Sequence, residues 1–431
     1  MPATFRALQY PGYRYLWLGQ LGHSAAMWME QVVRPLLVLE LTHSPLQVGL
    51  VVSVRMIPQL LFGLLAGVIA DRYDKRRVLM ISQIITMIMH LILALLLLGK
   101  RIEVWHVFVT AFISGGSMSF NQPARQTLIP RLVPSDLILN AIALNTAAMN
   151  TMRILGAGLA GGLLVFLDYG EVYLLNAIIF IYVIWTTAHI TFKELTSSPE
   201  LSLEKPGKPE KTSILYDLLE GFRYVAANRL VLYLVGMALV IFVIGFPYTQ
   251  VFIPLLALNV LHIGRSGAGW MLALTGVGAL IGSLTMASLK RLPRRGIILM
   301  IFLVVFGSAL LLLSQSRWIF LSVIGLIIAG GMSTAYNSLN ISLLFEQSPP
   351  NYHGRVLSLM SLDRGFVSVG AVLAGGLAEA LGPQLGLEVL ALTCIGLTLM
   401  IFFFIPALRK IDKPTKSSGT KPSGLSRSET R

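Results

Sequence analysis

The sequence predicts an all-α protein that crosses a membrane twelve times, as two six-helix bundles related by a parallel repeat. Of its 431 residues, 55% are hydrophobic and only 13% are charged, whereas soluble domains carry about 25% charged residues. The apolar residues fall into twelve runs long enough to cross a hydrocarbon core about 30 Å thick. In addition, motifs of the first half recur in the same order in the second.

Each apolar run is expected to form one membrane-spanning helix. The runs cover residues 15–41, 46–70, 78–99, 105–124, 137–167, 172–192, 230–259, 267–289, 296–314, 318–344, 355–381 and 386–408. Cys394 is the only cysteine, which excludes an intrachain disulfide and a multi-cysteine metal site. The seven scattered histidines offer no metal-ligand spacing, and no phosphate-binding loop motif is present, so we expect neither metal nor cofactor.

The net charge of +14 could suit a nucleic-acid partner, but its distribution points elsewhere. Twelve spans place both termini on one side of the membrane, and that side holds 26 of the 34 lysines and arginines. The opposite side holds only Lys100, Arg101, Arg265 and Arg317. By the positive-inside rule, both termini are cytoplasmic. We therefore expect a multi-pass protein of a bacterial inner membrane that binds no nucleic acid.

The polar segments divide the chain into four parts. Residues 1–192 would form the N-terminal bundle and residues 230–408 the C-terminal bundle. Residues 193–229 read as a cytoplasmic linker with an amphipathic surface helix, and residues 409–431 as a disordered tail.

The two halves share motifs at offsets between 214 and 220 residues. Pro35 and His43 of "RPLLVLELTHSPLQVGLV" pair with Pro254 and His262 of "IPLLALNVLHIGRSGAGWM". The other pairs are Gly67 with Gly282, "FNQ" from Phe120 with "YNS" from Tyr336, and "GAGLAGGL" (156–163) with "GAVLAGGL" (370–377). Five matches in order indicate a parallel repeat, as in many secondary transporters.

The stretch "GVIADRYDKRR" after the second run resembles the signature of the major facilitator superfamily. It matches at Gly67, Asp71, Arg72 and the basic cluster at 75–77, with Asp74 where the family usually has glycine. "LTHSPLQVGL", "PARQTLIPRLVP" and "NAIALN…MRILGAGLAGG" are similar to the bacterial exporter branch that includes enterobactin and macrolide exporters. Two features depart from the family pattern: span four lacks Arg-x-x-Gln-Gly, and Gly156 is followed by Ala157 and not by proline.

The resemblance implies a monomeric transporter, not an enzyme, that works by alternating access. It would export small amphipathic compounds of the drug or siderophore type, coupled to protons. Transport of a lysophospholipid or another lipid-like solute is an alternative within the same class. A non-transporting membrane sensor or assembly protein on the same fold is an alternative of another class.

Ionisable residues within the runs are the candidate site residues, because each costs at least about 2.5–3.5 kcal/mol to insert. On the first run, Gln20, His23, Met27, Glu30 and Arg34 share one helical face. This face could line a central cavity, with Glu30 or His23 meeting substrate or a proton. Alternatively, Glu30 and Arg34 form a self-neutralised pair that locks helix packing. Among carboxylates, we expect Glu30 first and Asp363 second to carry protons.

In the second half, the corresponding face is aromatic and apolar. It would oppose the charged face across a cavity suited to an amphipathic solute, although core packing explains the phenylalanines equally well. Arg153 could anchor substrate or gate the cavity, or it could be structural, capping carbonyl groups or pairing with Glu30 or Asp363. The residues expected to complete the cavity are Arg153, Phe242, Phe246, Gln250, Tyr336 and Asn337.

Three further groups are predicted to govern conformational change. Asp71 has no acidic counterpart in the repeat, because it aligns with Met286, and Asp74 aligns with Leu289. It could face the helix start near Gly354 or pair with Arg125 or Arg72. The predicted conformational latch is Gly67, Asp71, Arg72, Arg76, Arg125 and Gly354; the predicted cytoplasmic gate is Asp363 and Arg364; the predicted close helix contacts are at Gly156, Gly158, Gly161, Gly162, Gly375 and Gly376.

Overall fold

The computed structural model describes residues 3–191, 223, 225–289, 293–349, 353–409 and 411. For residues 64–72 and 353–364 it describes the backbone alone. The described residues form helices joined by short turns, with no strand among them, and confirm the predicted all-α fold. Most of the predicted linker and tail lie outside the described residues.

The first half contains six long helices whose bounds lie within a few residues of the predicted runs. They are α1 (Pro11–Thr42), α2 (Pro45–Arg72), α3 (Lys75–Leu98), α4 (Val104–Leu128), α5 (Ile138–Leu163) and α6 (Tyr169–Ala188). Short 3₁₀ segments, η1 (Ala3–Gln9), η2 (Ile129–Arg131) and η3 (Ser135–Leu137), lie at the ends of these helices.

The second half repeats this order with one broken span. Its long helices are α10 (Gly264–Ser288), α11 (Arg295–Gln315), α12 (Ile319–Gln347), α13 (His353–Leu381) and α14 (Pro383–Phe404), followed by the single turn α15 (Pro406–Arg409). The broken span consists of α8 (Arg229–Leu239), η5 (Val240–Gly245), η6 (Phe246–Tyr248), α9 (Phe252–Leu255) and η7 (Leu256–Val260).

The break in the seventh span is the main departure from the sequence prediction of one continuous helix. Segments η5 and η7 are π-helical, and η6 between them is a 3₁₀ turn. Pro247 and Pro254 lie within the broken region and have no N–H to donate, which interrupts the helical hydrogen-bond ladder. Single-turn π segments inside helices occur frequently at functional sites.

Eight of the described helical segments are long and apolar enough to cross a membrane by hydropathy. The part of α13 whose side chains are described, Gly365–Leu381, is a shorter apolar helix. The repeat is visible in the backbone as well, because His43 and His262 both have a φ of 51°. His43 ends α1 in the left-handed conformation, and its N–H donates to the carbonyl of Leu39. The paired histidines therefore end corresponding helices with corresponding geometry.

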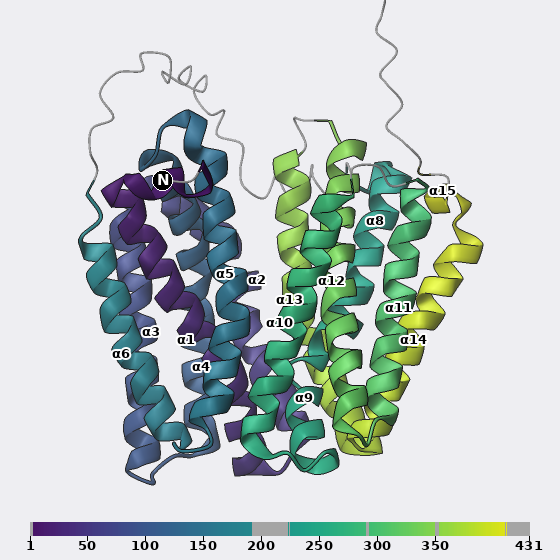
Figure 1. The fold of residues 1–431 in the computed structure, drawn as a ribbon, viewed down its shortest axis with the longest axis horizontal. Helices are drawn as coiled ribbons and strands as arrows, with labels where there is room; N and C mark the ends of the chain where they lie inside the picture. Colours follow the sequence, from purple (N-terminus) through teal and green to yellow (C-terminus); the bar gives the residue numbers. More distant parts are fainter. Residues whose placement is uncertain are drawn as a thin grey trace, which may run out of the picture.

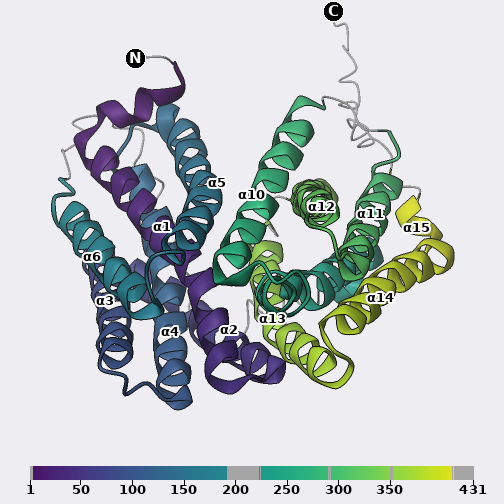
Figure 2. The same cartoon turned by 60° about the horizontal axis from the view of Figure 1, so that its bottom comes forward.

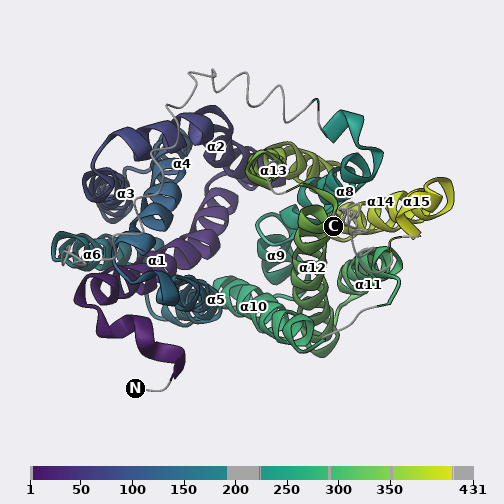
Figure 3. The ribbon, with the colours of Figure 1, turned by 90° about the horizontal axis from the view of Figure 1, so that it is seen from above.

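The helices form two groups that lie side by side in Figures 1 and 2, α1–α6 and α8–α15. We call them the N-terminal and C-terminal bundles. Helix α5 runs beside α10, and α2 beside α13 (Figure 3). We call the face that carries the N-terminus and α15 the terminus side, and the opposite face the far side (Figure 1).

Candidate functional site

Glu30 and Arg34 form a direct ion pair in the interior of the N-terminal bundle. Each is 2% exposed, and both Nε and Nη2 of Arg34 donate to Oε1 of Glu30. Arg55 of α2 donates to the other carboxylate oxygen at 2.7 Å. His90 Nε2 of α3 lies 3.5 Å from Glu30 Oε1. One carboxylate thus joins three helices.

Arg34 also ties α1 to α4. Its Nη1 donates to the carbonyl oxygen of Val107 at 3.0 Å and to Oγ1 of Thr110 at 3.2 Å. A buried charge is tolerated where it is both paired and hydrogen-bonded, and Arg34 meets both conditions. The cluster therefore stabilises one arrangement of four helices.

The other predicted residues on this face of α1 are buried beside the cluster. Met27 is 8% exposed and His23 is 6% exposed. The His23 ring meets Phe180 of α6 edge-on, with 5.7 Å between centroids. The ion-pair partners of Glu30 among the described side chains all belong to α1, α2 and α3. This face therefore lies inside the N-terminal bundle, not between the bundles, and a role in substrate or proton contact stays a prediction.

Other predicted residues meet at mid-depth, where the two bundles touch. Gln250 Nε2 donates to Oε1 of Gln31 across the interface at 3.1 Å. Arg153 of α5 donates to Oγ1 of Thr275 on α10 at 3.5 Å. Its guanidinium also lies 5.2 Å from the ring centroid of Trp28, within cation–π range. Arg153 therefore contacts α1 and α10 and does not pair with Glu30.

The aromatic residues of the seventh span lie on its broken part. Phe242 and Phe246 lie with their ring centroids 6.1 Å apart, and Phe246 is 38% exposed. On α12, Asn337 is exposed and Tyr336 is buried. The structure thus presents Phe246 and Asn337 at a surface and encloses Tyr336 in the C-terminal bundle.

Glycines allow the closest approach between the bundles. A Cβ added at Gly161 would lie 2.7 Å from the carbonyl oxygen of Ser266, and one at Gly375 would lie 2.7 Å from that of Pro45. Gly158 faces the ring of Trp270 on α10. Gly156 instead packs within its own bundle, against Ala25 of α1. The remaining predicted contact positions, Gly162 and Gly376, have no atom within 4 Å of an added Cβ.

Polar contacts close the far side on both flanks of the interface. At the start of α10, Arg265 donates to Glu40 at 2.6 Å and to Asp168 at 3.2 Å, and its guanidinium lies 4.6 Å from the ring centroid of Tyr169. On the other flank, Glu379 of α13 accepts from Oγ of Ser44 at 2.8 Å and from the N–H of Leu46 at 3.0 Å.

The faces of α5 and α10 that contact each other on the far side become exposed toward the terminus side; we call these faces the helical stripes. On α5 the stripe continues from Ile154 to Asn150, Ala147 and Ala143, all three exposed. On α10 the stripe beyond Gly276 continues to Leu280 and Leu284, which are 42% and 61% exposed. The bundles therefore contact each other along the far half of α5 and α10 and separate along the terminus half, as the ribbons show (Figure 2).

The predicted latch residues are only partly described. Arg76 donates to the carbonyl oxygens of Thr187 and Ala188 at the end of α6. Arg125, 2% exposed, donates to the carbonyl oxygen of Leu16 at 3.1 Å. The remaining latch and gate side chains lie outside the described residues, so their roles stay predictions; they are those at Gly67, Asp71, Arg72, Gly354, Asp363 and Arg364.

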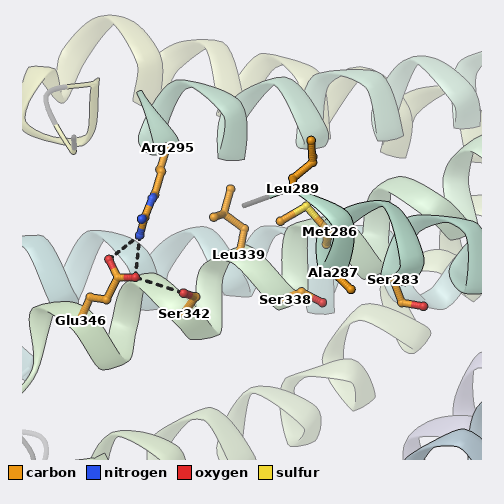
Figure 4. Close-up of a pocket in the computed structure, with 9 residues that line it drawn as sticks. All are labelled: Ser283, Met286, Ala287, Leu289, Arg295, Ser338, Leu339, Ser342 and Glu346. Atoms are coloured by element: carbon orange, nitrogen blue, oxygen red, sulfur yellow. Dashed lines mark hydrogen bonds and ion pairs between the residues drawn. The ribbon is translucent and has the colours of Figure 1, made fainter. Parts of the chain in front are cut away.

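A pocket of about 400 Å³ lies where α10, α11 and α12 meet on the terminus side (Figure 4). Met286 and Leu289, which align with Asp71 and Asp74, both line it. Arg295 donates to both carboxylate oxygens of Glu346 at 2.5 Å each. Glu346 of α12 thus supplies a carboxylate at this place in the C-terminal bundle. The second-half copy of "GVIADRYDKRR", residues 282–292, has no acidic residue of its own.

Two members of the charged cluster were not among the predicted site residues. Arg55 is 7% exposed and pairs with Glu30. His90 is fully buried. In the sequence, His90 is the lone polar residue of the apolar run "MIMHLILALLLL". A polar side chain in such a position typically faces protein and not lipid.

Among the described residues, no group of three potential metal ligands comes together. The candidate site therefore consists of a buried charged cluster within the N-terminal bundle and a polar and aromatic junction between the bundles.

Comparison with known proteins identifies the class. The family model for transmembrane secretion effectors matches residues 3–425, so the chain belongs to this family of the major facilitator superfamily. It is 25% identical to the staphyloferrin A transporter of Staphylococcus aureus, covering 91% of this chain and 96% of that one. It is 26% identical to the multidrug efflux pump Tap of Mycolicibacterium fortuitum, over 89% of this chain and 93% of that one. It is 25% identical to the enterobactin exporter EntS of Citrobacter koseri, over 94% of each.

Solved structures show the same fold at low identity. The nucleoside transporter NupG superimposes with a TM-score of 0.72 at 13% identity, over 93% of this chain and 99% of that one. A D-xylose–proton symporter superimposes with a TM-score of 0.66 at 14% identity, over 93% and 98%. The predicted family and fold are confirmed.

Proposed function

We propose that this protein is a secondary active transporter that exports small amphipathic compounds by alternating access. The single observation that carries the proposal is the one-sided contact between the bundles. Helices α5 and α10 touch along their far half, while the same stripes are exposed along their terminus half. Rocking of two bundles about a central site requires such a one-sided closure, and the relatives named as exporters support the direction of transport.

The orientation follows from the distribution of basic residues. The terminus side carries most of the lysines and arginines and is therefore the cytoplasmic side of a bacterial inner membrane. The structure then represents a state that is closed to the outside and receives substrate from the cytoplasm or the inner leaflet. Substrate would meet Arg153, Phe246 and the Gln31–Gln250 pair at mid-depth.

Proton coupling is assigned to Glu30. It is the one buried carboxylate among the residues whose side chains are described. Protonation would remove its charge and weaken its bonds to Arg34 and Arg55, which hold α1, α2 and α4 together. A proton bound or released at Glu30 can therefore bias the packing of the N-terminal bundle.

Transport in proteoliposomes tests this function. With a pH gradient imposed, the purified protein should move substrate, and Glu30→Gln should reduce the gradient-driven rate by about tenfold or more. Glu388→Gln is the matched control and should transport normally, because this half-buried carboxylate of α14 only accepts a hydrogen bond from Gln315, which an amide oxygen can also accept. Full gradient-driven transport by the Glu30 variant would reject the assignment.

Thermal stabilisation by drugs, siderophores and lysolipids would identify the substrate and separate drug export from lipid transport.

A further inference from the structure

The interior of the N-terminal bundle contains a series of buried polar groups that have no partner in the described structure. Gln83 of α3 and Asn176 of α6 are both fully buried, and neither amide makes a hydrogen bond among the described residues. The same holds for both ring nitrogens of His23, for Nδ1 of His90 and for the hydroxyl of Tyr173.

These groups follow α1 along its length. Near the terminus side, Arg125 bonds the carbonyl of Leu16 but leaves Nε and Nη2 unpaired among the described residues. Gln20 donates to Ser24 at 2.7 Å and leaves its oxygen without a partner there. The stretch from Gln20 to Glu30 spans about 15 Å of helix, roughly half of the hydrocarbon core.

Helix geometry and ring contacts relate several members of the series. On α1, His23 lies about one turn from Gln20 and two turns from Glu30, on the same helical face. The rings of His23 and His90 both pack against Phe180, at 5.7 and 5.4 Å between centroids. The ring centroids of Tyr173 and His90 lie 5.8 Å apart. These unpartnered groups of α1, α3 and α6 therefore share the interior of the N-terminal bundle, where ring contacts join His23 to His90 through Phe180 and His90 to Tyr173.

A buried amide left without any hydrogen bond costs about 1–3 kcal/mol, and this interior holds several such groups close together. Bound water resolves this cost, since each buried water typically makes two to four hydrogen bonds to such atoms. The groups supply both donors and acceptors for such water: amides offer both, and each neutral histidine offers one of each.

We propose that the interior of the N-terminal bundle holds a file of bound water that carries protons between the terminus side and Glu30. The file is separate from the substrate path between the bundles. Each water or histidine accepts a proton from one neighbour and passes one to the next, so the carboxylic acid of Glu30 becomes a carboxylate as one proton reaches solvent. This inference rests on the proposed proton coupling at Glu30.

The charges around Glu30 fit this role. It faces Arg34 on its own helix, Arg55 on α2, His90 on α3 and Tyr173 on α6. Arg125 of α4 lies toward the terminus end, and Arg153 of α5 lies on the other side of Trp28. These cations raise the electrostatic barrier to an excess proton in the file, so the Glu30 carboxylate is the group that attracts a proton there.

Hydroxyl-radical footprinting by X-ray radiolysis tests the water directly, because radicals formed from bound water oxidise neighbouring side chains. Met27 lies beside this file and is 8% exposed, whereas Met237 and Met271 of the C-terminal bundle are 0% and 3% exposed. We expect Met27 to be oxidised at least about tenfold faster than either control methionine, beyond what its small extra exposure explains. Equal rates at all three would overturn the file.

Variants test proton conduction separately. Gln83→Leu and Asn176→Leu keep approximate volume but remove the polar atoms, and should slow gradient-driven transport by about tenfold. Substrate exchange without a pH gradient and substrate affinity should not change. Asn340→Leu, at an equally buried and unpaired amide of α12, is the control and should leave coupling intact.

The outcomes separate the two proposals. Normal coupling in both leucine variants, with Glu30→Gln inactive, would overturn the file and leave proton coupling at Glu30 standing. Wild-type transport that ignores the pH gradient would overturn the coupling itself, and the conducting role of the file with it. Loss of substrate exchange together with coupling would show that the two groups only support the fold, which also overturns the file.

Discussion

At the scale of single residues, Arg34 and Arg55 hold the Glu30 carboxylate from two helices. Both arginines are nearly inaccessible, so each depends on Glu30 and its other acceptors to offset desolvation. With one carboxylate and two guanidinium groups, the cluster carries a net positive charge when His90 is neutral. Loss of Glu30 therefore leaves two unpaired guanidinium charges in the interior of the bundle, whereas loss of Arg55 leaves the Glu30–Arg34 pair.

Arg55→Met should lower the stability of the protein strongly. Without Arg55, Oε2 of Glu30 is left buried without its donor, which costs about 1–3 kcal/mol or more for a charged group, and methionine retains much of the side-chain volume. Thermal unfolding in detergent, followed by intrinsic fluorescence, measures the change. Arg101→Met, at an exposed position beyond α3, is the control and should shift stability by less than about 0.5 kcal/mol. Equal effects of the two substitutions would show that the Arg55–Glu30 bond contributes little.

The cluster also shows what sequence could and could not predict about the site. Glu30 and Arg34 stand four residues apart, so their pairing follows from helical geometry alone. Arg55 and His90 lie on other helices, 25 and 60 residues further along the chain, and nothing local fixes which side chains they meet. Which helical face turns toward the bundle interior depends on how all six helices pack, and periodicity in one helix does not specify it.

At the scale of elements, glycines determine how closely α5 and α10 approach. Gly161 and Gly269 face each other, and a Cβ added at Gly269 would lie 2.5 Å from the Cα of Gly161. Such spacing leaves no room for a methyl group without separation of the helices. The contact therefore exists only while both positions are glycine.

Gly161→Ala should destabilise far-side closure and shift the protein toward the opposite state. The added Cβ would lie 2.7 Å from the carbonyl of Ser266, so α5 and α10 must move apart. Spin labels at the far-side ends of α5 and α10 would report a longer mean distance. Gly162→Ala is the matched control, because an added Cβ there meets nothing within 4 Å. An unchanged distance in the Gly161 variant would mean that the helices adjust elsewhere.

Helix ends were predictable to within a few residues because the hydrocarbon thickness sets the length of each apolar run. The seventh span was predicted less well. Its composition from 230 to 259 is predominantly apolar, so hydropathy gave no sign of the π-helical segments η5 and η7. Pro247 and Pro254 were visible in the sequence, but α1 also contains Pro35 and remains one helix. Neighbouring helices decide whether a proline breaks a span.

At the scale of the whole molecule, the two bundles are held together at the far side by two separate sets of contacts. Arg265 joins Glu40 and Asp168 on the α5–α10 flank, and Glu379 joins Ser44 and Leu46 on the α2–α13 flank. Exposed ion pairs contribute about 0–1 kcal/mol each. Contacts of this strength can close one face and still break in each transport cycle.

A covalent bridge across the far side should arrest this cycle. In a Cys394→Ser background, Ser44→Cys and Glu379→Cys place two thiols at positions whose hydroxyl and carboxylate now lie within 2.8 Å of each other. A short bifunctional thiol-reactive reagent should join them, abolish transport and leave substrate binding intact, because the terminus side stays open. Cleavage of a reducible linker should restore transport. The matched pair Ala143→Cys and Ala287→Cys lies on exposed parts of α5 and α10 and should react across the bundles only after the protein turns outward. Normal transport with the far-side bridge in place would contradict alternating access about this interface.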